Sequence, residues 1–149
     1  MSRIVVALVA LSTLAACADA TPAPPAPGDV QSICYQNYAV EGTPTVTNTN
    51  YRSWREFPGL VDQQRALNNL RSAMMAEGFS NISVDASAGA LTAVQVHSIP
   101  GREPTLRVTA RRVGNGTRVD AIFMILPGQT TDSTLVRRNM CKIIDAANL

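Results

Sequence analysis

Two runs of alternating apolar and polar residues, joined by Gly114-Asn115-Gly116, constrain the fold more than any other part of the sequence. The runs cover residues 106–113 and 117–126, and such alternation is typical of strands with one buried face. Asn-Gly between them favours a two-residue turn, because both residues tolerate a positive φ. The sequence therefore predicts an antiparallel β-hairpin.

A two-residue loop at Asn115-Gly116 also fixes the register of this hairpin. One face becomes apolar along most of its length, and the other face places Arg111 opposite Asp120. A slip of one residue would destroy both patterns. The expected partners are Leu106–Ile125, Val108–Phe123, Ala110–Ala121 and Arg112–Val119 on the apolar face, with Thr109–Ile122 on the other face.

Two other segments carry apolar residues at the three- and four-residue spacing of helices. One covers residues 61–77 and stops at Gly78, and the other follows a capping Thr131 or Asp132 and ends near residue 146. Two shorter stretches, 82–84 and 91–97, are typical of strands. We therefore expect an α+β domain of two layers, an antiparallel four-stranded sheet with two helices on one face.

The region before the first expected helix is less regular. Residues 34–40 could form a strand, and a turn at residues 41–44 leads into a polar Thr/Asn loop over residues 45–50. We expect the following Tyr51-Arg52-Ser53-Trp54-Arg55 to continue as a loop, closed by Pro58-Gly59.

The N-terminus is organised as a secretory signal. Arg3 precedes an uncharged run over residues 4–16, which is too short to span a bilayer as a mature helix. The run closes on Leu14-Ala15-Ala16-Cys17, which resembles the lipobox of bacterial lipoproteins. This resemblance implies cleavage after residue 16, acylation of Cys17 and a lipid anchor in the cell envelope. Under the sorting rule of enteric lipoproteins, Ala18 in place of Asp favours the outer membrane, facing the periplasm.

The sequence therefore divides into a signal peptide (1–16), the acylated Cys17 with a Pro/Ala-rich linker (17–29), and one globular domain (30–149). We expect the linker to be a disordered, semi-stiff tether, because it holds no large apolar side chain. The element order and the lipobox are broadly similar to small envelope lipoproteins that pack two helices on a small antiparallel sheet. That resemblance contains no functional motif, so it transfers no site.

Two cysteines, Cys34 and Cys141, remain once Cys17 is assigned to lipid. A protein exported to an oxidising compartment usually pairs such residues. We predict one disulfide that ties the start of the domain to its last helix; the alternative is two buried free thiols.

The composition argues against several classes of function. Without the signal, 12 Lys or Arg face 11 acidic residues, which is too balanced to indicate nucleic acid as a partner. His97 is the only histidine, and no nucleophile or acid at a suitable spacing completes a catalytic set around it. One histidine and two paired cysteines leave too few ligands for zinc. We expect no enzyme activity, no metal and no cofactor.

Two features could form a binding surface. The first is the expected loop with Tyr51, Arg52, Trp54 and Arg55, since aromatic and Arg residues dominate interface hot spots; alternatively, Trp54 caps the core. The second is the hairpin face with three arginines, which could instead be a solvated polar face. Those arginines are Arg107, Arg111 and Arg118.

These observations lead to a non-catalytic, lipid-anchored accessory protein that binds another envelope protein or stabilises an assembly. The alternative is a small-molecule or glycan-binding domain, with a pocket between the helices and the segment 43–57. A sizeable apolar pocket lined by Trp54 would favour that alternative.

Overall fold

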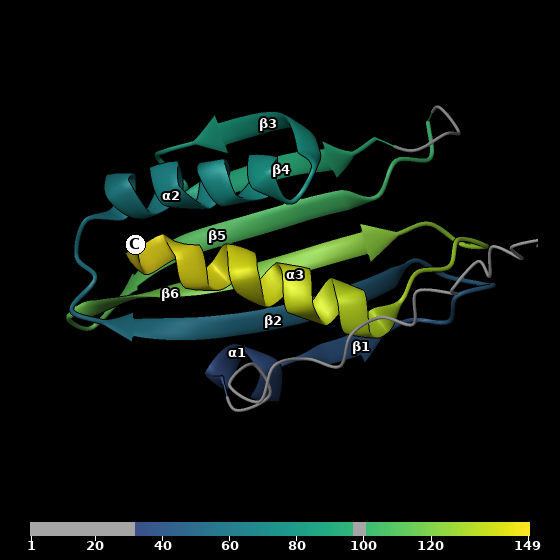
Figure 1. Cartoon of the computed structure of the whole chain (residues 1–149), viewed down its shortest axis with the longest axis horizontal. Coiled ribbons are helices and arrows are strands. Elements are labelled where there is room, and N and C mark those ends of the chain that lie inside the picture. Colours follow the sequence, from purple (N-terminus) through teal and green to yellow (C-terminus); the bar gives the residue numbers. More distant parts are fainter. Residues whose placement is uncertain (1–31, 97–100) are drawn as a thin grey trace, which may run out of the picture.

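The computed structural model describes residues 32–96 and 101–149, in which six antiparallel strands form one sheet with three helices. The strand order is β1-β2-β6-β5-β4-β3 (Figure 1). In chain order the elements are α1 (Ile33–Gln36), β1 (Ala39–Glu41), β2 (Thr49–Pro58), α2 (Gln63–Ala76), β3 (Phe79–Asp85), β4 (Ala90–Gln95), β5 (Thr105–Val113), β6 (Gly116–Ile125) and α3 (Ser133–Asp145), followed by a 3₁₀ turn, Ala146–Asn148.

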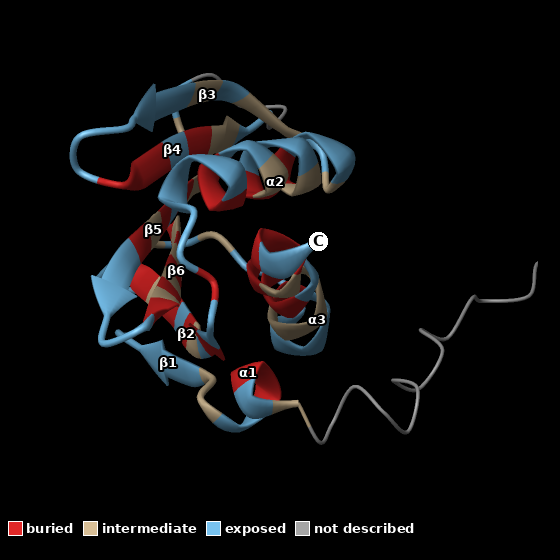
Figure 2. Ribbon diagram, turned by 90° about the vertical axis from the view of Figure 1, so that its left-hand side faces the viewer, coloured by how far each residue is buried: buried red, intermediate tan, exposed pale blue. Residues whose placement is uncertain are grey.

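The domain has two layers, because all three helices lie on the same side of the sheet (Figure 2). The core between the layers combines the apolar faces of α2 and α3 with the inward residues of the sheet. Its largest fully buried side chains include Leu67, Leu70, Met74, Leu91, Leu106, Ile143 and Ile144. No helix of the described residues covers the opposite face of the sheet.

The expected α+β class and layering agree with this arrangement, but the four-stranded sheet with two helices is wrong. The additional elements α1, β1 and β2 all come from residues 33–58. Within residues 34–40, where a strand was expected, the chain first forms α1 and only then the short β1. Ser32 begins that helix, since its hydroxyl accepts a hydrogen bond from the Tyr35 amide at 3.3 Å.

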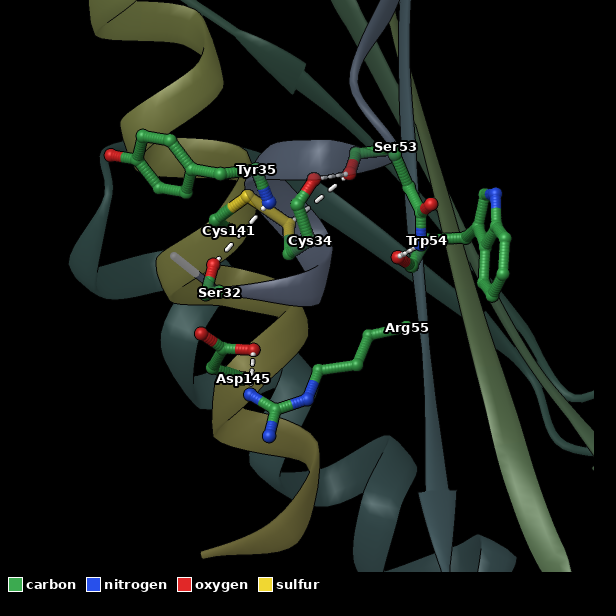
Figure 3. A network of polar contacts seen from close by, with 9 residues as sticks. Ser32, Cys34, Tyr35, Ser53, Trp54, Arg55, Cys141 and Asp145 are labelled. Atoms are coloured by element: carbon green, nitrogen blue, oxygen red, sulfur yellow. Dashed lines mark hydrogen bonds and ion pairs between the residues drawn. A yellow bond between two sulfur atoms is a disulfide. The ribbon is translucent and has the colours of Figure 1, made fainter. Parts of the chain in front are cut away.

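β2 replaces the loop expected at residues 51–57 and pairs with β6 along its whole length. Its inward positions include Ser53 and Arg55, two polar residues that obscure the alternation in the sequence. Both have partners on the helix side. The Ser53 hydroxyl donates to the Cys34 carbonyl at 2.6 Å, and Arg55 pairs with Asp145 of α3 at 2.7 Å (Figure 3).

The β5–β6 hairpin exists, but its loop is Gly114-Asn115 rather than Asn115-Gly116. Gly114 has a φ of 57°, and glycine at the first loop position is the pattern of a type II′ turn. The register is therefore displaced by two residues from the expected one, which keeps the predicted apolar face but changes every partner. The observed pairs are Leu106–Phe123, Val108–Ala121, Ala110–Val119, Arg112–Thr117, Thr109–Asp120 and Arg111–Arg118.

The two long helices confirm the sequence prediction. Asp62 caps α2 by accepting from the Arg65 amide at 2.9 Å, and Asp132 caps α3 by accepting from the Thr134 amide at 2.8 Å. Gly78, with a φ of 84°, follows α2 and turns the chain into β3.

The disulfide between Cys34 and Cys141 is present and joins α1 to α3 (Figure 3). Both cysteines are buried. The predictions for the signal peptide, Cys17, the linker and His97 concern residues outside the described ranges.

Candidate interaction face of the sheet

The four residues that were expected to share one loop lie on β2, where their side chains alternate between the two faces of the sheet. Tyr51 and Arg55 point toward the helices, whereas Arg52 and Trp54 occupy the opposite, uncovered face. Figure 3 shows Trp54 on the far side of β2 from Arg55. Tyr51 is buried beside Phe123, with ring centroids 6.1 Å apart. These two inward residues belong to the core and its margin and not to a binding surface.

The outward residues of β2 lie beside the three arginines predicted on the hairpin, so the two candidate surfaces are one. The pairing of β2 with β6 and of β6 with β5 arranges nine side chains in three rows. We call this set the arginine face. Its rows are Glu56–Arg118–Arg111, Trp54–Asp120–Thr109 and Arg52–Ile122–Arg107.

Trp54 is held by its neighbours on this face. The guanidinium of Arg118 lies 4.0 Å from the centre of a Trp54 ring, a cation–π contact. Arg118 also donates hydrogen bonds from Nε and Nη2 to the Asp120 carboxylate, at 2.9 to 3.2 Å. The Asn37 side chain donates to the Trp54 carbonyl at 3.0 Å. This network fixes a large aromatic side chain before any partner arrives.

The charges of the arginine face do not balance. Arg118 occupies both oxygens of Asp120, and Arg111 adds a third approach to the same carboxylate at 3.3 Å. Among the described residues, no carboxylate lies within 4.0 Å of Arg107. The face holds four arginines against Glu56 and Asp120, and Arg52 also pairs with Glu41 of β1 at 3.2 Å. Its unbalanced positive charge therefore lies on the side of Arg107 and Arg111.

A shallow hollow of about 300 Å³ lies at the margin of this face toward β1. Trp54, Arg52 and Asp120 contribute to its walls, and Ile122 contributes an apolar side chain. Asn37 and Ala39 line the remaining side. The hollow therefore combines an aromatic surface with donors and an acceptor.

The helix side offers much less space. The crevice between α3 and the ends of β3, β4 and β6 holds about 60 Å³, below the roughly 300 to 1,000 Å³ of ordinary ligand pockets. Trp54 is not among its lining residues, and most of the segment 43–57 belongs to β2. The ligand pocket expected between the helices and that segment is therefore not supported.

Among the described residues, three side chains have shifted pKa values. Burial raises the pKa of Tyr38 and of Tyr51. A hydrogen bond from the Ser87 hydroxyl lowers the pKa of Asp85, which lies in the turn-side end of β3. Within residues 32–96 and 101–149, no three His, Cys, Asp or Glu residues gather as metal ligands. Over the same residues, every helix is too short or too polar to cross a membrane.

Comparison with known proteins adds little. No family model and no curated protein matches the chain. A structural comparison finds the crystal structure of CalU16 from Micromonospora echinospora, which is 12% identical. The match covers 74% of this chain and 82% of that chain, with a TM-score of 0.46. A likeness of this strength carries no argument about function.

Sequence reasoning named the arginines and Trp54 but placed them on two surfaces. The signal that joins them is the alternation of Asn50, Arg52, Trp54 and Glu56 with Tyr51, Ser53 and Phe57. The inward positions of this pattern can be recognised as core-facing only when the helix-side partners of Ser53 are known.

Proposed function

We propose that this protein is a non-catalytic, lipid-anchored accessory lipoprotein of the bacterial cell envelope that binds another envelope protein through the arginine face. The observation that supports the proposal is an uncovered sheet face on which Trp54 is already fixed by Arg118. Trp and Arg are the residue types most enriched in interface hot spots. A side chain that is ordered before binding loses less conformational entropy in the complex.

The lipid anchor of the proposal rests on the sequence alone. Acylation of Cys17 would attach the chain to the outer membrane, on the periplasmic side. A Pro-rich tether extends roughly 3 Å per residue, so the linker would keep the domain within a few tens of ångströms of the membrane. The partner would then be a membrane protein or a protein held close to the membrane.

Site-specific photocrosslinking in the native bacterium tests the binding face. A benzophenone amino acid at Ile122 lies in the arginine face, and the same amino acid at Met75 lies on the exposed side of α2. We expect the Ile122 position to crosslink to a defined envelope protein and the Met75 position to give no such product. Equal products from both positions, or none from Ile122, would contradict the proposal.

Metabolic labelling with an alkyne fatty acid tests the anchor. The wild-type chain should incorporate the label and fractionate with membranes, whereas the Cys17→Ser variant should do neither. Labelling that persists in the variant would refute the assignment of Cys17.

A second candidate function has one observation in its favour, the hollow lined by Trp54. An aromatic wall beside Arg and Asp side chains suits a saccharide ring, although about 300 Å³ is at the lower end for a ligand pocket. Trp54 is the only Trp of the chain, so its fluorescence reports on this hollow directly. Saturable quenching by soluble peptidoglycan fragments would favour the glycan-binding alternative over protein binding.

A further inference from the structure

The outward side chains of β5 form a distinct part of the arginine face. Arg107, Thr109 and Arg111 point to the same side, and the two arginines are four positions apart along the strand. At about 3.3 Å per residue their Cα atoms lie about 13 Å apart. Two long cationic side chains thus flank Thr109, which has Ala90 beside it on β4 and Asp120, already held by Arg118, beside it on β6.

The two guanidinium groups have unused capacity for binding an anion. Arg118 already satisfies both oxygens of Asp120, so Arg111 reaches that carboxylate only as an additional donor, at 3.3 Å. Arg107 has no ionic partner among the described residues. Arginine presents a planar fork of donors that matches the geometry of a carboxylate.

We infer that the partner of the arginine face is a protein with an acidic segment that places a carboxylate side chain over Thr109, between Arg107 and Arg111. This inference rests on the proposed function and specifies the chemistry of its partner. The Thr109 hydroxyl offers a third donor between the two arginines. Binding of the carboxylate neutralises the charge excess of the face, which gives electrostatic complementarity and favours this partner over a neutral one.

The distribution of charge favours an acidic protein over an anionic lipid surface. Glu56 and Asp120 share the arginine face, and Asp85 lies beyond Ala90 in the same row as Thr109. A continuous layer of lipid phosphates would approach all three carboxylates together with the arginines, at a repulsive cost. A protein partner can instead place its carboxylates at chosen points.

Charge reversal on the full-length, anchored chain tests the inference. The variant Arg107→Glu/Arg111→Glu carries the benzophenone amino acid at Ile122, and its crosslink yield is compared with wild type. The matched control is Arg71→Glu/Arg138→Glu, which changes the charge equally on α2 and α3. We expect at least a tenfold loss for the first variant and less than a twofold change for the control. The pair Arg107→Gln/Arg111→Gln repeats the measurement without new negative charge, and thermal melting verifies that each variant folds.

Mass spectrometry of the crosslinked peptide supplies the second readout. The inference expects an Asp or Glu within a few residues of the attachment point, and a crosslink yield that falls as salt is raised. A peptide without any acidic residue, or equal yields for the charge-reversal variant and its control, overturns the inference while leaving the proposed function intact. Absence of any Ile122 crosslink overturns both.

A vesicle-binding experiment tests whether the arginines bind anionic lipids instead of an acidic protein. The purified chain in a Cys17→Ser background, which removes the acyl anchor, is mixed with vesicles of equal parts phosphatidylglycerol and phosphatidylcholine. No difference in vesicle binding between this parent and its Arg107→Glu/Arg111→Glu variant is the expected result. Loss of vesicle binding in that variant alone would overturn the inference in favour of a lipid surface.

Discussion

The disulfide between Cys34 and Cys141 gives the prediction with the largest expected effect on stability. It connects α1, a helix of only four residues, to the long helix α3. A helix of that length has almost no stability of its own in water. We therefore replace both cysteines with alanine, in a Cys17→Ser background that leaves no other thiol.

The expected loss follows from the length of the closed loop. The two cysteines are 107 residues apart in sequence. In the chain-entropy model, closing a loop of this size stabilises the native state by about 4.7 kcal/mol. Ordinary domains have a total free energy of unfolding of about 5 to 15 kcal/mol, so the bond accounts for a large share. Removing two buried sulfur atoms adds a smaller packing loss.

Equilibrium unfolding in guanidinium chloride measures the difference. We expect the free energy of unfolding to fall by about 4 to 5 kcal/mol relative to the Cys17→Ser parent. Hydrogen exchange should also accelerate in residues 33–41 more than in the paired strands β5 and β6. A loss below about 1 kcal/mol would show that loop entropy is the wrong explanation. Uniform acceleration of exchange would show that the bond does not hold α1 locally.

Three further measurements test other contacts. Gly116→Ala should lower the free energy of unfolding by about 1 to 3 kcal/mol, because the new Cβ would lie 2.5 Å from a carbonyl oxygen of β2; an unchanged denaturation midpoint would rule out this close approach. Arg118→Ala should cost about 1 kcal/mol and shift the emission of Trp54 to the red, since the stacked guanidinium is removed; emission that stays unchanged would contradict the stacking. In an NMR titration the pKa of Asp85 should lie below its ordinary value of 3.8 and rise in Ser87→Ala. Because that pKa is lowered by folding, the carboxylate's stabilising effect is present above the unfolded pKa and is lost as the pH falls through the folded value; equal midpoints in both proteins would remove the role of the hydroxyl.

The parts of the fold that sequence predicts well are those fixed by local chemistry. Apolar periodicity, the stop at Gly78 and the expected cap at Thr131 or Asp132 place both long helices close to their observed ends, whereas the cap of α2 at Asp62 is seen only in the structure. The hairpin was found because its alternation is strong. The predicted register is wrong because Gly-Asn-Gly contains two possible two-residue loops: Asn115-Gly116 suits a type I′ turn, and Gly114-Asn115 suits a type II′ turn. The two registers differ by an even number, so only the partners change and not the buried face.

The missed strand β2 and the divided site have a common physical cause. Ser53 and Arg55 occupy inward positions where a core-facing strand usually has apolar residues. Ser53 donates to the Cys34 carbonyl and Arg55 pairs with Asp145, and both partners are distant in sequence. The local sequence pattern does not predict partners that are distant in the chain. Without β2 in the sheet, Trp54 could not be placed beside Arg118.

The pairing of β2 with β6 has a consequence for the order of events in folding. β2 lies early in the chain but can pair with β6 only after that last strand has been made. The disulfide can form later still, because it requires Cys141. Topologies with such distant contacts fold slowly. A chain that emerges from its N-terminus therefore presents β2 before β6, its neighbour on one side, has emerged. Its exposed edge during that interval is where we expect premature aggregation to start.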